Sequence, residues 1–380
     1  MNSNKYILTY GFAIFAMFFG SGNLVFPVAV GYYSSSNWIA GFAGLFITGI
    51  LLPFLGLYVI KLHKGDYNKF FAQGGLIAKY ILPLFTLSLL GSFAVVPRCI
   101  VVAHGGISFI SQDVTLFAFS MCFCIFTYFA CLKEKLMVSL LGKFMSPIMI
   151  ILLITLIFFG VFTAKAPIGE TQTWLSFSKG FTTGYQTMDL FAAFFFSSLV
   201  YKQLQDSMPK GASDKEILRY SIKPAILGSV LLGLVYLGLV FLGAYYRDML
   251  DLNAPELMLP SISNHLLGKY STIFIAVAML FSCFTTAVAL NNIYADYLCD
   301  LLKINKSYFW LVLIFTTLIS LVVSLLNFKG IAAFLAPVLE VTYPGLIALT
   351  ILSIGLNKLQ KVKLVIFWAV TLLMLAIKLV

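Results

Sequence analysis

Eleven apolar segments, separated by short polar breaks, make up most of this 380-residue chain. Each is about 20 residues long or longer, which is the length that a helix needs to cross a hydrocarbon core of about 30 Å. Isolated strands or loops would leave backbone groups unpaired in lipid, so segments of this length favour helices. They run over residues 7–33, 38–60, 76–110, 114–132, 144–164, 181–200, 224–245, 271–299, 307–326, 331–355 and 364–380. The sequence therefore predicts an all-α polytopic membrane protein with about 11 transmembrane helices.

The composition agrees with a chain that lies in a bilayer. Hydrophobic residues make up 61% of the sequence and charged residues 10%, whereas a soluble domain has about 25% charged residues. This excludes a soluble enzyme, a disordered protein and a nucleic-acid-binding protein. The chain also lacks a His-Glu-x-x-His motif, a Gly-x-Ser-x-Gly motif and a phosphate loop, so a membrane-embedded enzyme is not expected.

The net charge of +11 is explained by where the basic residues fall. With the N-terminus placed inside, 18 lysines and arginines lie at inner positions and six at outer positions. Cytoplasmic loops of membrane proteins carry such an excess of positive charge. The bias predicts a cytoplasmic N-terminus in a multi-pass membrane protein, and no anionic partner such as nucleic acid is needed to explain the charge.

The first apolar segment contains a cluster of residues that weaken a helix. Gly20, Ser21, Gly22 and Asn23 follow one another, and Pro27 lies one turn further on. Proline lacks a backbone donor and glycine has a high entropic cost in a helix, so we expect a break near the middle of this segment. A broken helix exposes carbonyls from its first half and amides from its second half, which can hold a cation and a carboxylate. The alternative is a kink at a tight helix contact.

The segment 271–299 contains a second group of candidate ligands. The hydroxyls of Thr285 and Thr286 and the carbonyl of Ser282 are hard oxygen ligands of the kind that a small alkali cation prefers. Threonines in membrane helices commonly bond to their own helix instead, and the pair alone leaves both interpretations open.

Few ionisable residues lie inside the apolar segments, and such groups usually face the bundle interior or a water-filled path. We expect Arg98 and Asp189 either to pair with each other or to bind a ligand directly. Glu340, between two prolines, is a candidate for lining an ion path, whereas Asp296 is expected to be solvated near a helix end. His104 is the remaining group of this set.

The eleven segments divide into two units of five and one additional helix. Residues 7–164 and 181–355 each hold five segments, and an odd number of spans places the second unit upside down relative to the first. No linker marks a second domain, so residues 1–380 are expected to form one transporter domain, with 364–380 as the additional helix. Sites between the first helices of two inverted repeats are typical of secondary transporters. Four glycines recur every five residues in 224–245 without forming one face, which predicts a closely packed core helix.

The chain resembles a known family in five motifs that extend over nearly its whole length. The motifs are Phe15-Ala16-Met17-Phe18-Phe19-Gly20-Ser21-Gly22-Asn23-Leu24-Val25-Phe26-Pro27; Val96-Pro97-Arg98; Gly184-Tyr185-Gln186-Thr187-Met188-Asp189; Cys283-Phe284-Thr285-Thr286-Ala287; and Pro337-Val338-Leu339 with Tyr343-Pro344. On these residues the chain is similar to the bacterial branched-chain amino acid:cation symporters, or branched-chain amino acid carrier proteins.

The resemblance implies a leucine-transporter-like fold, with a 5+5 inverted repeat and broken helices 1 and 6. It also implies import of leucine, isoleucine and valine with sodium, and no cofactor or metal other than the sodium ion. The implied sodium ligands are Ala16, Phe19, Ser282, Thr285 and Thr286. The implied substrate-binding residues are Gly20, Ser21, Gly22, Asn23, Phe194, Ser197 and Ser198, with the break in helix 6 near Phe194 to Ser198. Phe194 and its neighbours could also face lipid or the core.

Three other functions remain open from the sequence. The transporter could couple to protons, carry another neutral amino acid such as methionine or alanine, or act as a non-transporting sensor on the same fold.

Overall fold

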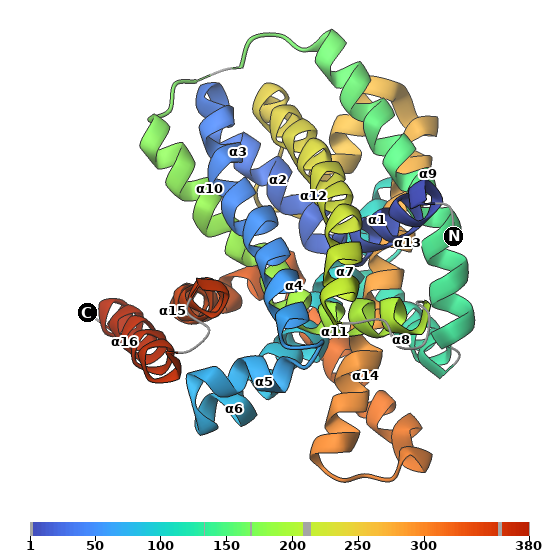
Figure 1. Cartoon of the computed structure of the whole chain (residues 1–380). Coiled ribbons are helices and arrows are strands. Elements are labelled where there is room, and N and C mark those ends of the chain that lie inside the picture. The colour runs from blue at the N-terminus through green and yellow to red at the C-terminus, as the bar shows by residue number, and fades with distance from the viewer. Residues whose placement is uncertain (1–2, 133, 168, 208–213, 356–358, 380) are drawn as a thin grey trace.

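The computed structural model describes residues 3–132, 134–167, 169–207, 214–355 and 359–379. Within these ranges the chain forms helices and no strand (Figure 1). Seven helices in the described part are long and apolar enough to cross a membrane, and three shorter apolar helices accompany them. These helices cover all of the expected segments except 181–200, which is divided between two helices. The prediction of an all-α polytopic membrane protein is confirmed.

The expected segments of the first unit each match one helix or a pair of helices. The helices are α1 (Ser3–Phe18) and α2 (Ser21–Ser34); α3 (Trp38–Phe46) and α4 (Leu52–Leu62); α6 (Leu76–Ser88) and α7 (Val95–Ile110); α8 (Leu116–Leu132); and α9 (Glu134–Thr163). A short helix, α5 (Tyr67–Phe71), lies between α4 and α6.

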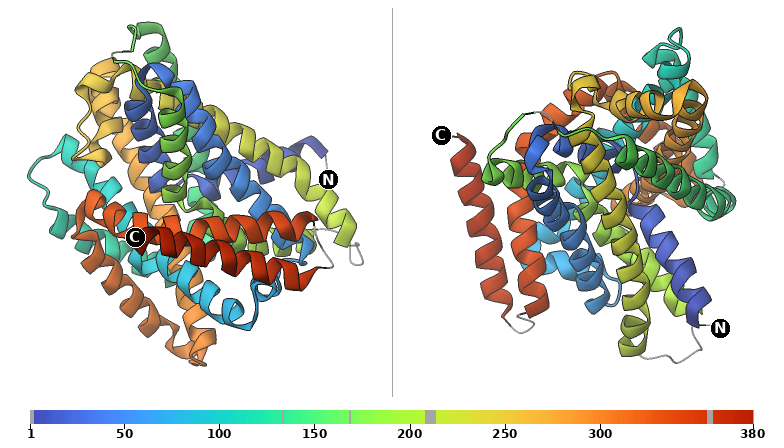
Figure 2. Two further views of the ribbon diagram at one scale, coloured as in Figure 1. Left: turned by 90° about the vertical axis from the view of Figure 1, so that its left-hand side faces the viewer. Right: turned by 90° about the horizontal axis from the view of Figure 1, so that it is seen from above.

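The second unit and the additional helix follow in the same way. They comprise α10 (Thr173–Thr187) and α11 (Asp189–Ser207); α12 (Asp214–Tyr245); α13 (Met258–Leu301); α14 (Phe309–Ser324); α15 (Asn327–Gly355); and α16 (Gln360–Leu379). Helix α13 is bent at Gly268, where φ is +77°. Glycine tolerates this left-handed conformation, and the expected segment 271–299 lies after the bend. Helix α16 packs beside α15 at the edge of the bundle, as both views in Figure 2 show.

Contacts between the helices repeat with the two units exchanged. The two halves of the first segment, α1 and α2, both pack on α12, which is the seventh segment. The two halves of the sixth segment, α10 and α11, pack on α3 and α4, which form the second segment. Exchanging segment 1 with 6 and segment 2 with 7 converts one set of contacts into the other. Two repeats related by a twofold axis produce this pattern.

Glycines bring several of these helices into backbone contact. A Cβ atom built on Gly180 of α10 would lie 1.9 Å from the carbonyl oxygen of Gly41 in α3. A Cβ atom on Gly243 of α12 would lie 2.0 Å from the carbonyl oxygen of Val28 in α2. Small residues permit such close crossings, where van der Waals contact holds membrane helices together.

The four recurring glycines of α12 face different neighbours, as their spacing predicted. Gly228 lies against α1, Gly238 against α9 and Gly243 against α2, and Gly233 lies near α3. Helix α12 is therefore packed on several sides, and its glycines form no single face.

Candidate substrate and ion site

The first segment is broken where its sequence predicted. Helix α1 ends at Phe18 and α2 begins at Ser21. Between them, Gly20 adopts an extended conformation with φ −117° and ψ −160°, and its N–H donates to Oδ1 of Asn23 at 3.4 Å. Ser21 and Asn23 are buried, so the first turn of α2 lies inside the bundle. The amides of this turn are the positive end of a half-helix within the protein interior.

The sixth segment is also broken, but not where the resemblance placed the break. Helix α10 ends at Thr187 and α11 begins at Asp189. Met188 separates them in the left-handed conformation, with φ +60° and ψ 17°. The expected break near Phe194 to Ser198 is therefore wrong, because those residues lie within continuous helix.

A buried arginine contacts the end of α10 and the residue at the second break. The Nη1 atom of Arg98, from α7, donates to the carbonyl of Gln186 at 2.6 Å, and Nη2 donates to Sδ of Met188 at 3.2 Å. Arg98 is fully buried. The guanidinium thus binds a carbonyl near the end of α10 whose helical partner is lost at the break.

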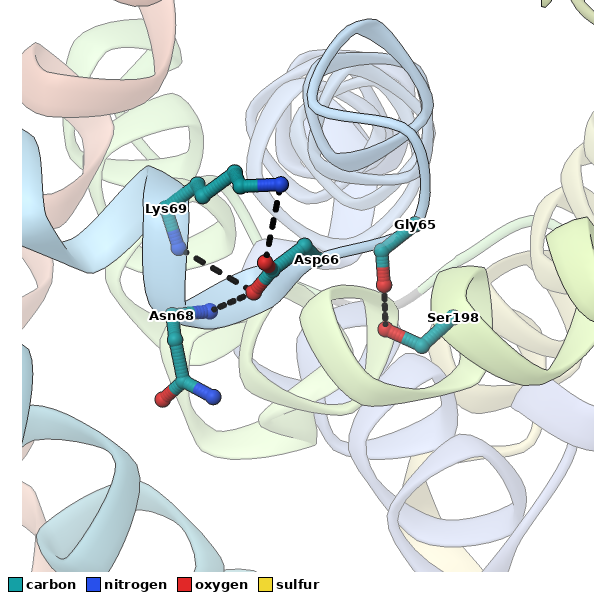
Figure 3. Close-up of polar contacts among 5 residues, drawn as sticks. All are labelled: Gly65, Asp66, Asn68, Lys69 and Ser198. Carbon is teal, nitrogen blue, oxygen red and sulfur yellow. Dashed lines mark hydrogen bonds and ion pairs between the residues drawn. The ribbon is translucent and has the colours of Figure 1, made fainter.

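The residues around the wrongly placed break have other partners. Phe194 is fully buried and packs against Phe70, with ring centroids 4.9 Å apart. The hydroxyl of Ser197 donates to the carbonyl of Leu57 at 2.7 Å. The hydroxyl of Ser198 donates to the carbonyl of Gly65 at 2.5 Å, beside the Asp66 side chain that accepts from the first amides of α5 (Figure 3). These contacts attach α11 to α4 and to the connection before α5, and they remove the reason for placing Phe194, Ser197 and Ser198 at the substrate site.

The two breaks face each other. A Cβ atom built on Gly22, in the first turn of α2, would lie 3.4 Å from Cα of Thr187 at the end of α10. The Nδ2 atom of Asn23 donates to Oδ2 of Asp189, the first residue of α11, at 2.8 Å. The hydroxyl of Tyr236, from α12, donates to the same Oδ2 at 3.2 Å and also contacts Nδ2 of Asn23. One hydrogen-bonded network therefore joins both broken helices to α12.

Sequence reasoning missed Tyr236. It lies in a run of aliphatic residues, and nothing in its own helix distinguishes it from a core tyrosine. Its role becomes visible only because α12 packs on α2 and brings it to Asn23 and Asp189.

Four of the five candidate ion ligands lie together at the end of α1, next to the first break. Ala16, Phe19, Ser282 and Thr285 line one cavity of about 80 Å³ between α1, α9 and α13. The hydroxyl of Ser282 donates to the carbonyl of Phe19 at 2.9 Å, and the hydroxyl of Thr285 donates to the carbonyl of Ser282 at 2.9 Å. Thr285 therefore agrees with both interpretations of the threonine pair: its hydroxyl bonds to its own helix, and it also lines the cavity where a cation could bind.

The fifth candidate ligand lies against the break itself. Oγ1 of Thr286 would be 3.1 Å from a Cβ atom built on Gly20. The set of carbonyl and hydroxyl oxygens from two helices fits a hard alkali cation by its chemistry.

The remaining membrane charges take structural positions. Glu340 forms an ion pair with Lys378 of α16 at 2.5 Å, and both side chains are partly exposed. Asp296 is exposed and pairs with Lys306 at 2.8 Å, which agrees with the expected solvation. The ion pairs of the described residues do not include Arg98 with Asp189, although the charges of these two buried side chains act on each other. His104 contacts the carbonyl of Val114 through Nε2 at 2.8 Å.

Solved structures of low sequence identity share this arrangement. Mhp1, a nucleobase-cation-symport-1 family transporter in a closed conformation with bromovinylhydantoin bound, is 14% identical and matches with a TM-score of 0.64, over 91% of this chain and 77% of that one. MhsT in complex with L-phenylalanine is 14% identical and matches with a TM-score of 0.56, over 95% of this chain and 98% of that one. These likenesses show the fold, which is leucine-transporter-like as the sequence motifs implied.

Curated relatives match over most of their length. The branched-chain amino acid transport system 3 carrier protein of Pseudomonas aeruginosa is 30% identical over 91% of this chain and 80% of its own. The branched-chain amino acid permease BrnQ of Haemophilus influenzae is 29% identical over 96% of this chain and 84% of its own. A family profile described as "Branched-chain amino acid transport protein" matches residues 3–380. The chain therefore belongs to the branched-chain amino acid transport protein family, whose members are membrane transporters and not enzymes.

Proposed function

We propose that this protein is a secondary active symporter that imports leucine, isoleucine and valine together with sodium. One observation supports sodium as the coupling ion. Ala16, Phe19, Ser282 and Thr285 line one cavity, and Thr286 lies against the first break. The branched-chain substrates are supported by the names of the relatives and the family. The proposed location is the cell inner membrane, by similarity to the bacterial relatives, and the charge bias supports a cytoplasmic N-terminus.

Sodium at this cavity would connect two helices that are far apart in the sequence, α1 and α13. The carbonyl of Ala16 belongs to the end of α1 and that of Phe19 to the break directly after it, while Ser282 and the threonines belong to α13. A cation held between them would favour the arrangement of the first break that accepts substrate. Binding of sodium and of substrate would then be coupled, since each stabilises the same conformation.

The amino acid would lie between the facing breaks. The amides of Ser21 and Gly22, at the start of α2, offer a positive site for the α-carboxylate. Alternating access would move one repeat relative to the other around this point.

The available free energy is sufficient for concentrative uptake. A tenfold sodium gradient supplies about 1.4 kcal/mol, and one positive charge moving through a potential of 100 mV supplies about 2.3 kcal/mol. Together they support accumulation of roughly several-hundred-fold at one sodium ion per substrate.

The test is uptake of labelled leucine into proteoliposomes that contain the purified protein. An inward sodium gradient, an inward proton gradient and no gradient are compared, with isoleucine and valine as competitors. Sodium-stimulated uptake that both competitors abolish is the expected result. Uptake driven by protons alone would refute the sodium assignment. Binding of leucine without uptake would refute the transport function and leave the sensor, and absence of both in folded protein would refute the substrate class.

The double variant Thr285→Ala, Thr286→Ala tests the ion site directly. It should abolish sodium stimulation, because two of the five proposed oxygen ligands are removed. The matched control is Thr155→Ala: this threonine is exposed on α9 and bonds only to its own helix, at 2.8 Å to the carbonyl of Ile151. Uptake by the double variant that keeps the sodium dependence of the control would overturn the assigned site.

A further inference from the structure

The carboxylate of Asp189 is buried where the two helix breaks face each other, and it forms no ion pair with a basic side chain of the described residues. Its residue is 4% exposed and opens helix α11. The ion pairs of the described residues are Lys69–Asp66, Lys306–Asp296 and Lys378–Glu340, and none of them involves Asp189. A buried charge that no ion pair neutralises is unfavourable, and ionisable groups inside membrane helices commonly mark ligand or ion sites.

Arg98 is a basic side chain whose charge acts on Asp189, but it forms no ion-pair contact with the carboxylate. Arg98 directs Nη1 to the carbonyl of Gln186 and Nη2 to Sδ of Met188. These bonds hold the second break in position, so the arginine supports the site without capping the carboxylate.

The hydrogen bonds to Asp189 are unevenly distributed over its two oxygens. Asn23 and Tyr236 both donate to Oδ2, at 2.8 and 3.2 Å. The hydroxyl of Thr187 donates to the carbonyl of Gly184 at 2.9 Å and accepts from the backbone amide of Asp189 at 3.4 Å. Oδ1 therefore accepts no hydrogen bond from the described part of the chain. The amide of Asn23 and the phenol of Tyr236 are neutral donors. Oδ1 is therefore the oxygen of Asp189 that is open to a cationic hydrogen-bond donor.

The start of α11 offsets the charge only in part. A carboxylate in the first turn of a helix is favoured by the helix dipole, which acts as a fractional charge. Since the dipole supplies less than one full positive charge, it does not replace a cation in contact with Oδ1.

We propose that Asp189 binds the α-ammonium group of the transported amino acid through Oδ1. The proposal rests on the function proposed above, because it assigns one half of the substrate zwitterion within the same site. The α-carboxylate would meet the amides of Ser21 and Gly22, and the ammonium group would meet Asp189. Asn23 links the two places through its bond to Oδ2, so it is a positioning residue for the carboxylate.

The experiment compares leucine with 4-methylpentanoate, which has the same carbon chain and carboxylate but no ammonium group. Binding of labelled leucine, and its displacement by 4-methylpentanoate, are measured with the purified protein in sodium-containing buffer. Asp189→Asn should weaken leucine binding by about 10- to 100-fold, because a charge-assisted hydrogen bond is lost. Binding of 4-methylpentanoate should be unchanged or tighter, since this ligand never makes that bond.

Further variants separate binding from folding. Asp189→Ser is a second neutral variant if Asp189→Asn does not fold, and Asp189→Glu should retain more leucine affinity than either because it keeps the charge. Asp296→Asn is the matched control, since Asp296 is exposed and pairs with Lys306 away from the breaks. It should leave both ligands unaffected.

Two results would overturn the proposal. Equal weakening of leucine and 4-methylpentanoate would show that Asp189 only maintains the shape of the site. Unchanged leucine affinity with lost uptake would make Asp189 a group for ion coupling. Wild-type protein that fails to bind or transport leucine would refute the proposed function itself, whereas wild-type binding with an insensitive variant refutes only the role of Asp189.

Discussion

The crossing of α3 and α10 provides a sharp test of the packing that positions the second break. In Gly180→Ala, the new Cβ atom would lie 1.9 Å from the carbonyl oxygen of Gly41. An ordinary contact needs about 3.4 Å, so the helices must separate by roughly 1.5 Å. The obstacle is backbone and no side-chain rotation relieves it.

The expected cost follows from two opposing contributions. Overpacking of this kind destabilises by about 1–3 kcal/mol, and a rigid backbone neighbour places Gly180→Ala at the upper end or beyond. Replacing glycine by alanine within a helix gains about 1 kcal/mol. We therefore expect a net loss of about 2 kcal/mol and weakened uptake, because α10 carries Thr187 at the break.

The assay is thermal unfolding of the purified protein in detergent, together with leucine uptake. The matched control is Gly233→Ala on α12, where the nearest atom to the new Cβ is Phe46 at an ordinary 3.6 Å. The control should be as stable as the wild type or more so. If Gly180→Ala unfolds at the wild-type temperature and transports normally, the close crossing and the reasoning built on it are refuted.

Two further predictions concern the middle of α11 and the connection after α4. Ser197→Ala should lower the unfolding free energy by about 1 kcal/mol, through loss of the bond to Leu57, and leave the leucine affinity unchanged; a selective loss of affinity would restore Ser197 to the substrate site. Burial and the nearby charge of Lys363 lower the pKa of His63 from 6.5. Stability from neutral His63 is therefore present above about pH 6.5 and lost as pH falls through the lowered value. His63→Gln should show a smaller fall in unfolding temperature from neutral to acidic pH than wild type, and identical falls would contradict this.

Much of the membrane architecture could be predicted from local sequence. Apolar length determines which segments can cross a bilayer, and it identified the spans before any contact was known. The break at Gly20 was also predictable, since two glycines and Pro27 weaken the helix through their own backbone properties. The candidate ligands Thr285 and Thr286 were recognisable because hydroxyl pairs are chemically distinct within an apolar helix.

The second break could not be located in the same way. Residues 184–189 contain no proline, and the interruption falls on Met188, a residue with no intrinsic preference for the left-handed conformation. What accompanies the break is tertiary: Arg98 of α7 bonds to Gln186 and Met188, and Asn23 and Tyr236 bond to Asp189.

The sequence by itself thus determined the class of the protein, its spans and the first break, because these depend on properties of neighbouring residues. Only the tertiary structure decided which polar side chains contact one another. Asn23, Asp189 and Tyr236 are separated by 47 to 213 positions along the chain, and helix packing alone brings them to one point. Oδ1 of Asp189 accepts no hydrogen bond from the described residues there, because Asn23 and Tyr236 both donate to Oδ2 and Arg98 donates to Gln186 and Met188.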